Sequence, residues 1–234
     1  MGFNNLGVEH AVEMLRIRPK NFIIGGNIGK NTLTPNEKAV DDYCYCFEKL
    51  YDFVDYFVIN VSCPNIGDID SLQDQESLMV ILGQLVTLRA QKGPKKPILL
   101  KISPDLNFQQ IDETIDIIVK LGIDGIVATN TTKTRNGLVT DENKVKSIGN
   151  GGLSGAPLGD RSTELIRYIK TKTNGKMPII GVGGIMSVED ALEKIEAGAD
   201  LIQIYTGFIY EGPGFVKRIN RELVRRGKTK LEKN

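Results

Sequence analysis

The chain has 234 residues, of which 41% are hydrophobic and 25% charged, and its formal net charge is +1. This balance fits one soluble globular domain with a sizeable core, and the near-neutral charge gives no support for nucleic-acid binding. No apolar run reaches the roughly 20 residues that cross a membrane, and no signal peptide opens the chain.

The sequence has one histidine and three cysteines, which limits the sites that these residues could form. The single histidine, His10, disfavours His-based metal sites and Ser-His-Asp triads. The three cysteines, Cys44, Cys46 and Cys63, lack zinc-site spacing and indicate a reducing compartment. Cys44 and Cys46 are two positions apart in a helical pattern, so they face different sides and predict packing. We therefore expect no metal site.

Apolar runs rich in β-branched residues alternate with amphipathic helical patterns along the chain. The predicted strands are 22–27, 56–60, 98–102, 125–128, 178–182 and 201–204. The predicted helices are 8–18, 36–50, 71–92, 107–121, 163–173, 188–197 and 215–226. Gly122 stands where a helix C-cap glycine belongs. The aperiodic residues 133–152 predict a long loop, which in the barrel favoured below would lie over the mouth.

Six alternations of strand and helix predict a parallel sheet covered by helices, in the α/β class. A doubly wound sheet and a barrel both fit this rhythm. Polar residues follow every predicted strand, the last two strands end in Gly183-Gly184 and Tyr205-Thr206, and no G-x-G-x-x-G follows the first strand. These features favour a TIM-type (β/α)8 barrel with six identifiable βα units, in a single domain over 1–234.

The residues after the predicted strands are mostly amides, hydroxyls and glycines. They are Asn27, Asn60, Cys63, Asn65, Lys101, Thr129, Asn130, Thr131, Gly155, Gly184, Tyr205 and Thr206. The set holds one lysine and no acid, which disfavours carboxylate or metal hydrolysis. Asparagine both donates and accepts hydrogen bonds, so the set suits a flat heterocycle such as a flavin or a pyrimidine.

Seven segments, taken in order, resemble the dihydroorotate dehydrogenase family. They are residues 27–31 (Asn-Ile-Gly-Lys-Asn), 60–65 (Asn-Val-Ser-Cys-Pro-Asn), 101–105, 129–132, 151–155, 181–184 and 205–206. The segments 129–132 and 151–155 look most like those of the quinone-using, membrane-associated class 2 enzymes. The resemblance implies an FMN enzyme of pyrimidine biosynthesis that oxidises dihydroorotate to orotate and passes the electrons to a quinone.

The resemblance also implies a role for each residue. Cys63 takes a proton from C5 of dihydroorotate while C6 passes a hydride to flavin N5, and Lys101 stabilises the reduced flavin. The remaining FMN-binding residues are Asn27, Asn60, Thr129, Gly155, Gly184, Tyr205 and Thr206, the last four at the phosphate. The substrate-binding residues are Asn60, Asn65, Asn130 and Thr131. The loop over 133–150 forms a lid.

Two departures from the family pattern stand out. Cys63 occupies a base position that class 2 enzymes fill with serine, and six strands are found where the family has eight. The chain is therefore expected to lack the N-terminal part of the barrel, which in class 2 also docks to the membrane. We expect the full-length form to be peripheral on the cytoplasmic side of the inner membrane, and this chain alone to be soluble and cytoplasmic.

Other readings stay open. A flavin barrel that oxidises or reduces another pyrimidine fits the same residues. A non-catalytic barrel fragment that assembles with a second copy as a homo-oligomer also fits, because missing strands leave open sheet edges. A phosphate-binding isomerase is disfavoured, since no carboxylate is expected beside Lys101.

Overall fold

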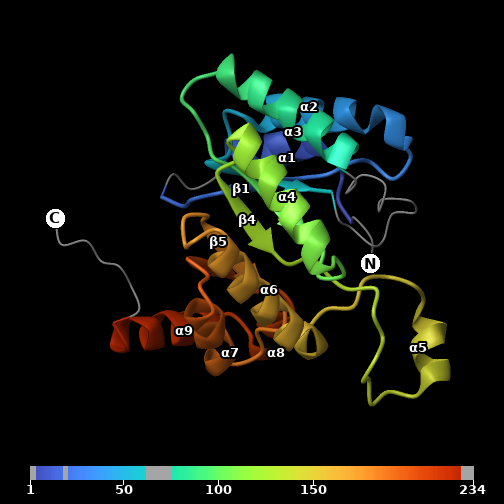
Figure 1. The fold of residues 1–234 in the computed structure, drawn as a ribbon, viewed down its shortest axis with the longest axis vertical. Coiled ribbons are helices and arrows are strands. Elements are labelled where there is room, and N and C mark those ends of the chain that lie inside the picture. Colours follow the sequence, from blue (N-terminus) through green and yellow to red (C-terminus); the bar gives the residue numbers. More distant parts are fainter. Residues whose placement is uncertain (1–3, 18–20, 62–74, 228–234) are drawn as a thin grey trace. The chain divides into compact units, whose positions relative to one another are not determined.

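The computed structural model describes residues 4–17, 21–61 and 75–227, and the chain divides into two compact units (Figure 1). The first unit comprises Met1–Ile102 and Leu106–Ile126. The second unit comprises Ser103–Asp105 and Val127–Asn234. One strand, β4 (Gly125–Ala128), begins in the first unit and ends in the second.

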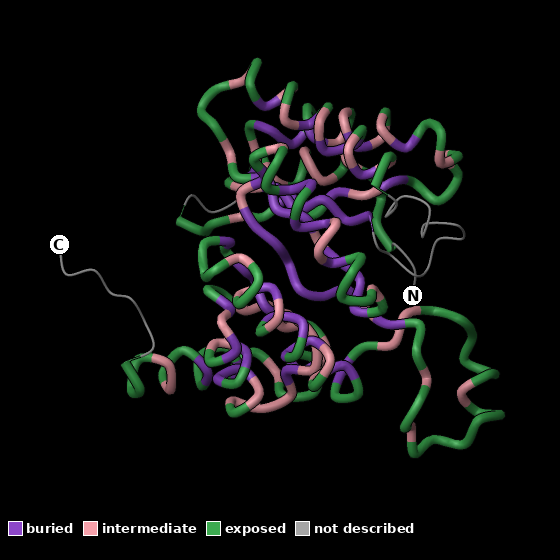
Figure 2. Tube along the Cα trace, in the orientation of Figure 1, coloured by how far each residue is buried: buried purple, intermediate pink, exposed green. Residues whose placement is uncertain are grey.

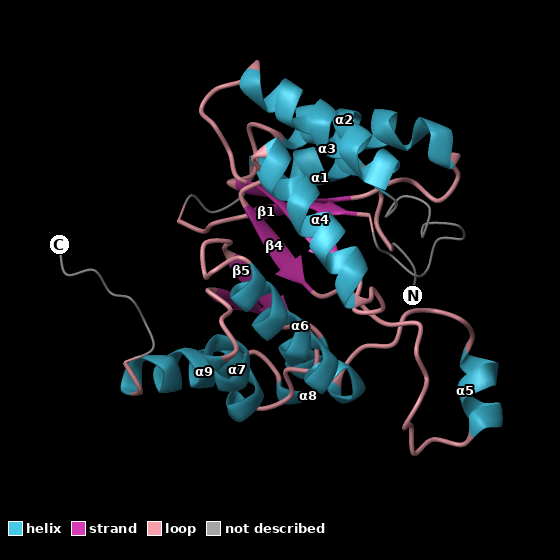
Figure 3. Ribbon diagram, in the orientation of Figure 1, coloured by secondary structure: helices cyan, strands magenta, loops and turns pink. Residues whose placement is uncertain are grey.

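The first unit alternates helices with parallel strands (Figure 3). Its elements are α1 (Val8–Arg16), β1 (Gly25–Ile28), the 3-10 helix η1 (Asn36–Lys38), α2 (Ala39–Leu50), β2 (Tyr56–Asn60), α3 (Gln75–Ala90), β3 (Ile98–Ile102) and α4 (Phe108–Leu121). Strand β2 pairs in parallel with β1 on one side and with β3 on the other. Strand and helix therefore follow the order that the hydrophobic pattern predicts.

The second unit continues the same alternation. Its elements are α5 (Glu142–Ile148), the 3-10 helix η3 (Ala156–Leu158), α6 (Gly159–Lys172), β5 (Ile179–Val182), α7 (Val188–Glu196), β6 (Leu201–Gln203), α8 (Thr206–Glu211) and α9 (Gly214–Arg225). Strands β5 and β6 pair in parallel, and the Thr129 N–H after β4 donates to the Val182 carbonyl of β5 at 2.7 Å. The six expected strand and helix repeats are confirmed.

An aromatic cluster fixes which face of the first unit's strands is covered by helices. Phe47 of α2 and Tyr51, the residue that follows α2, lie with their ring centroids 4.3 and 6.0 Å from that of Phe57 in β2, and all three are buried. In Figure 2 the buried residues, drawn in purple, run along the strands of this unit. Neighbouring strand residues point to opposite faces. Because Phe57 faces α2, the side chains of Val58 and Asn60 point to the other face.

Three aspartates join neighbouring strands at the ends where the strands begin. Asp55 accepts a bond from the Ile24 N–H at 2.7 Å through its carboxylate, and its own N–H donates to the Ile24 carbonyl at 2.7 Å. The same reciprocal pair recurs between Asp124 and Ile98, with both bonds at 2.9 Å, and between Asp200 and Ile179, at 2.9 and 2.8 Å. We call these pairs the aspartate clamps. Each closes the start of one strand pair: β1–β2, β3–β4 or β5–β6.

Local capping sets several helix ends. Asn107 and Gln110 form a capping box at the start of α4, with both bonds at 2.9 Å, and Ser187 and Asp190 form another at the start of α7. Gly122 ends α4 in the left-handed conformation, at φ 67°. The predicted C-cap glycine is confirmed.

Some boundaries differ from the prediction. The predicted loop contains α5, a short polar helix that begins because the Asp141 carboxylate accepts bonds from two backbone N–H groups of its first turn. Helix α6 begins at Gly159, four residues before the predicted start, and Ser162 in this extra turn donates to the Val182 carbonyl at 2.8 Å. The first strand begins at Gly25, three residues after the predicted start, and the Phe22 and Ile23 side chains before it are exposed.

Candidate functional site

Three candidate residues of the first unit share one face of the sheet. Asn60, the last residue of β2, lies opposite Lys101 of β3 in the strand register, and Asn27 of β1 lies opposite Val58. Paired residues point to the same face, as do residues two apart in one strand. Asn27, Asn60 and Lys101 therefore point together, away from the aromatic cluster and α2.

These three side chains differ in exposure. Asn60 is buried, with 6% of its surface exposed, Lys101 is half-buried and Asn27 is exposed. The Tyr43 hydroxyl of α2 donates to the Asn60 carbonyl at 2.9 Å, which fixes the end of β2. The arrangement offers amide donors and acceptors and one ammonium group to a ligand on this face.

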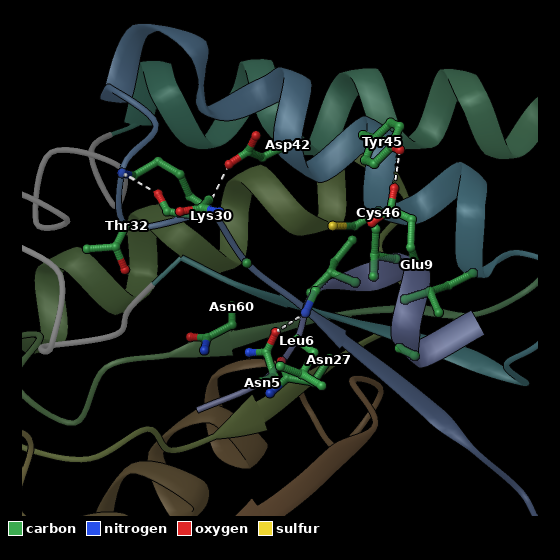
Figure 4. Close-up of a pocket in the computed structure, with 17 residues that line it drawn as sticks. Asn5, Leu6, Glu9, Asn27, Lys30, Thr32, Asp42, Tyr45, Cys46 and Asn60 are labelled. Atoms are coloured by element: carbon green, nitrogen blue, oxygen red, sulfur yellow. Dashed lines mark hydrogen bonds between the residues drawn. The ribbon is translucent and has the colours of Figure 1, made fainter. Parts of the chain in front are cut away.

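A cavity of about 920 Å³ opens beside this face within the first unit. Its lining includes Asn27 and Asn60 from the strands and Asp42, Tyr45 and Cys46 from α2. Figure 4 shows the α2 side chains on one side of the cavity and the two asparagines on the other. A cavity of this size is in the range that holds a small ligand or part of a cofactor.

The helix side of the cavity is held by polar contacts. Lys30 is 4% exposed, and its ammonium donates to the carbonyls of Asn31, at 3.1 Å, and Thr34. The Asn31 N–H donates to Asp42 at 2.7 Å. Burial, then Asp42 and Glu9, raise the pKa of Cys46 to about 11, so this thiol stays neutral at neutral pH.

In the second unit, a buried polar turn follows β4. Thr129 and Asn130 are 2% and 8% exposed, and Thr131 is half-buried. The Thr129 hydroxyl donates to the Asn130 carbonyl at 3.0 Å, and the Asn130 side-chain oxygen accepts the Thr131 N–H at 2.9 Å. The second contact fixes the orientation of the Asn130 carboxamide.

The loop that follows this turn is tied at its base. Thr132 and Leu153 form an antiparallel bridge whose two N–H···O bonds measure 3.1 and 2.8 Å. The Asp105 carboxylate accepts the Thr132 hydroxyl and, at 2.8 Å, the Lys133 N–H. Asp105 belongs to a motif that the sequence singles out, and its role as an anchor for this loop was not predicted.

The glycines predicted at the phosphate form close backbone contacts in the second unit. A Cβ on Gly184 would lie 2.2 Å from the Gly159 Cα at the start of α6. A Cβ on Gly155 would lie 3.2 Å from the Thr206 Cγ2, and the Thr206 hydroxyl donates to Ser154 at 3.0 Å. We call Gly155, Gly159, Gly184 and Thr206 the glycine cradle.

The glycine cradle fits a phosphate group. Glycine lets backbone N–H groups approach an anion closely, and the first turn of the 14-residue α6 adds the positive end of a helix dipole. Gly155 and Gly184 both have positive φ, at 88° and 72°. Tyr205 is 65% exposed, so its predicted contribution would come through the backbone.

The structure thus brings the predicted residues into two groups, one in each unit. Asn27, Asn60 and Lys101 form the first; Thr129, Asn130, Thr131, Gly155, Gly184, Tyr205 and Thr206 belong to the second. Cys63 and Asn65 lie outside the described residues. Sequence reasoning missed Ser154 and also Lys194, a lysine three positions after Ala191 on the buried side of α7. The three-residue spacing from Ala191 was the sequence signal that could have indicated that Lys194 is buried.

Two further properties bear on the kind of site. Within the ranges that the structure describes, each helix is too short or too polar to cross a bilayer. Nor does that part of the chain gather three or more His, Cys, Asp or Glu side chains in a group that could hold a metal ion.

Comparison with known proteins identifies the family. A sequence model described as dihydroorotate dehydrogenase matches residues 1–226. A protein named dihydroorotate dehydrogenase (quinone) from Christiangramia forsetii is 55% identical over 227 residues, covering 97% of this chain and 65% of that protein. One of the same name from Gloeobacter violaceus is 47% identical, covering 100% of this chain and 63% of that protein.

Solved structures agree with the sequence matches. The ligand-free DHODH of Eimeria tenella aligns with a TM-score of 0.85 at 32% identity, covering 96% of this chain and 67% of that one. Its complex with ferulenol aligns with a TM-score of 0.81. The chain spans less than two thirds of the length of the curated relatives named above. Its fold is of the expected α/β barrel class, with six βα units, and the expected resemblance to the quinone-type enzymes is confirmed. From its sequence, its fold and these relatives, the chain belongs to the dihydroorotate dehydrogenase family.

Proposed function

We propose that this protein oxidises dihydroorotate to orotate with FMN as cofactor and a quinone as the final electron acceptor, in pyrimidine biosynthesis. The observation that carries the proposal is the common face of Asn27, Asn60 and Lys101 at the ends of three parallel strands. Ligands of α/β barrels bind where the strands end. We further propose that residues 1–234 form a single FMN-binding barrel domain.

The FMN-binding roles divide according to chemistry. Asn27, Asn60 and Thr129 would offer hydrogen bonds to the flavin ring, and Lys101 would place a positive charge at its pyrimidine edge. Gly155, Gly184, Tyr205 and Thr206 would hold the phosphate, for which the close backbone contacts of the glycine cradle provide the fit. When bound, FMN accepts the hydride that leaves C6 of the substrate.

The substrate would be held by amides and hydroxyls. Asn60, Asn65, Asn130 and Thr131 match the ring amides and the carboxylate of dihydroorotate, which need both donors and acceptors. The Asn130 carboxamide is already oriented by the Thr131 N–H at 2.9 Å. A side chain that is fixed before binding loses less entropy when it meets its ligand.

Cys63 is proposed as the base that removes the proton from C5. A free thiol has a pKa of about 8.5, and positive charge beside a thiol lowers its pKa toward neutrality, which makes cysteine suited to the role of base. A serine hydroxyl at that position would need more assistance. Cys63 receives the proton, the hydride leaves C6, and a C5–C6 double bond forms in orotate.

The quinone suggests where the reaction takes place. Quinones dissolve in the bilayer, so we propose that the full-length enzyme acts as a peripheral protein on the cytoplasmic side of the inner membrane. The names of the relatives support the choice of acceptor. Reduction of a water-soluble quinone after addition of dihydroorotate would test it.

The visible spectrum of the purified chain, with FMN added, tests the proposed function. We expect flavin bands near 370 and 450 nm (roughly, from the cofactor's own chemistry) that bleach when dihydroorotate is added. Bands that bleach with dihydrouracil instead would indicate a flavin barrel for another pyrimidine. Absence of FMN binding would contradict the assignment of FMN as the cofactor.

The base is tested separately. Cys63→Ala should bind FMN as the wild type does and lose the bleaching by dihydroorotate, because no group takes the C5 proton. Cys44→Ala is the matched control, since burial raises the pKa of that thiol and Cys44 is not among the residues that line the cavity. Bleaching that survives in Cys63→Ala at the wild-type rate would show that the base has been assigned wrongly.

A further inference from the structure

Helix α7 carries a buried lysine that the proposed reaction does not use. Lys194 is 1% exposed and lies on the side of α7 that also buries Ala191 and Leu192. Lysine is almost never fully buried, because moving its charge out of water is costly unless other groups satisfy it.

The partners of Lys194 lie in the first turn of α6. Its ammonium donates to the Gly159 carbonyl at 2.7 Å and to the Thr163 hydroxyl. The Thr163 hydroxyl also donates to the Gly159 carbonyl, at 3.1 Å. Three groups thus meet at one end of α6, and the Gly159 carbonyl is their common acceptor.

This end of α6 is electrostatically unusual. The N-terminus of a helix carries partial positive charge, so a cation nearby is unfavourable there and an anion is favourable. Burial lowers the pKa of Lys194, while Glu193, Asp190 and Asp160 oppose that effect and Arg167 adds to it. The fold therefore keeps a buried lysine beside a positive helix end, and both features would favour an anion bound at this end of α6.

Gly159 connects Lys194 to the glycine cradle. The Gly159 backbone occupies the space of a Gly184 Cβ, which would lie 2.2 Å from its Cα and 2.3 Å from its nitrogen. The Leu158 side chain also lies close to Gly183, with its Cδ2 2.9 Å from the position of a Cβ there. Holding the Gly159 carbonyl in place therefore holds the start of α6 against the turn after β5.

We propose that Lys194 is a positioning residue for the phosphate of the cofactor. It acts through Gly159, fixing the start of α6 against Gly184, and it adds buried positive charge behind the glycine cradle. Lys194 would thus favour FMN over riboflavin, which has the same ring without the phosphate. The inference rests on the proposed function, because it takes FMN as the ligand.

Flavin binding by the whole chain provides the test. Flavin fluorescence is titrated with wild type, Lys194→Met and Lys176→Met, once with FMN and once with riboflavin. We expect Lys194→Met to weaken FMN binding about tenfold, the size of one charge-assisted contact, and to leave riboflavin binding unchanged. Lys176 is an exposed lysine of the same unit, so Lys176→Met should change neither.

Each other outcome has a defined meaning. Equal weakening of both flavins would show that Lys194 only supports the fold, and no change would show that it has no role; either overturns the inference. If wild type binds FMN no better than riboflavin, the glycine cradle is not a phosphate site and the inference falls while the flavin assignment stands. If wild type binds neither flavin, the proposed function fails, and the inference with it.

A second variant covers the case in which Lys194→Met does not fold, as judged by circular dichroism. Thr163→Val keeps the volume of the side chain and removes the hydroxyl that joins Lys194 to Gly159. We expect a loss of about threefold for FMN alone, roughly half the free energy of a tenfold change. Unchanged FMN binding in folded Thr163→Val would then overturn the inference.

Discussion

The two units present their candidate residues in opposite ways. In the first unit the strand ends offer side chains, namely the amides of Asn27 and Asn60 and the ammonium of Lys101. In the second unit the glycine cradle offers backbone, with Gly184 so close to Gly159 that no side chain fits between them. The first group should therefore depend on chemical identity and the second on volume. Substitutions that change only one of these properties can separate the two.

The largest effect is expected from volume in the second unit. Gly184→Ala should destabilise the fold by about 3 kcal/mol, because its Cβ would meet the Gly159 backbone at 2.2 Å. FMN binding should be lost with it. Urea unfolding and flavin titration measure the two effects.

Gly212→Ala is the control for Gly184→Ala. Gly212 has the same φ of 72°, but nothing lies within 4 Å of its Cβ position. It should show backbone strain alone, about 1 kcal/mol. If both variants lose equal stability, conformation rather than close contact explains the glycine at 184.

The next largest effect is expected from charge in the first unit. Lys101→Met keeps much of the side-chain length, so the fold should survive, but turnover of dihydroorotate should fall about 100-fold. The reason is the loss of positive charge where negative charge develops. Steady-state kinetics measure it, with the exposed Lys120→Met as control. Full activity in Lys101→Met would remove Lys101 from the site.

A smaller effect separates the two asparagines of the first unit. Asn60 is 6% exposed and Asn27 is exposed, so water replaces the Asn27 amide more readily. Asn60→Ala should weaken orotate binding about tenfold, whereas Asn27→Ala should leave orotate binding unchanged and weaken FMN about threefold. Calorimetric titration with each ligand distinguishes them. Equal losses of orotate binding would contradict the assigned roles.

The smallest effect concerns the aspartate clamps, in which the two units do not differ. Burial raises the pKa of Asp124, but the Ile98 N–H and the Arg89 charge outweigh it, so the pKa lies below its ordinary value of 3.8. A carboxyl with a lowered pKa stabilises the fold fully above its unfolded pKa and loses that contribution as the pH falls through its folded pKa.

Asp124→Asn should therefore cost about 0.5 kcal/mol near neutral pH, and the difference from wild type should shrink below pH 3.8. Urea unfolding at pH 7 and pH 3 measures both values. A difference that stays constant over this range would mean that the carboxylate charge has no part in the clamp.

Part of this picture could be predicted from the sequence. The strands 56–60, 98–102 and 125–128 have the predicted bounds, because a continuous run of buried apolar residues marks a parallel strand directly. The C-cap at Gly122 was also predictable, since its signal is local. The polar strand ends also predicted the candidate residues, and their functional roles stay predictions; Cys63 and Asn65 lie outside the described residues.

Other features depend on contacts between segments far apart in the chain. The early start of α6 rests on Ser162 meeting the Val182 carbonyl, and the burial of Lys194 rests on the first turn of α6. Neither partner can be identified from local pattern. Helix α5 was missed for another reason: a capping aspartate begins it, and its polar residues give no hydrophobic period.

The aspartate clamps have a consequence for how the architecture tolerates change. Each seals one strand pair by its own contacts, at the ends opposite to the candidate site, and none shares a residue with another. The three clamps are thus independent of one another. A substitution that breaks one clamp weakens one strand pair and leaves the other two clamps intact. Because the clamps lie at the opposite ends of the strands, the loops beside the candidate site can vary in sequence without disturbing the contacts that join the strands.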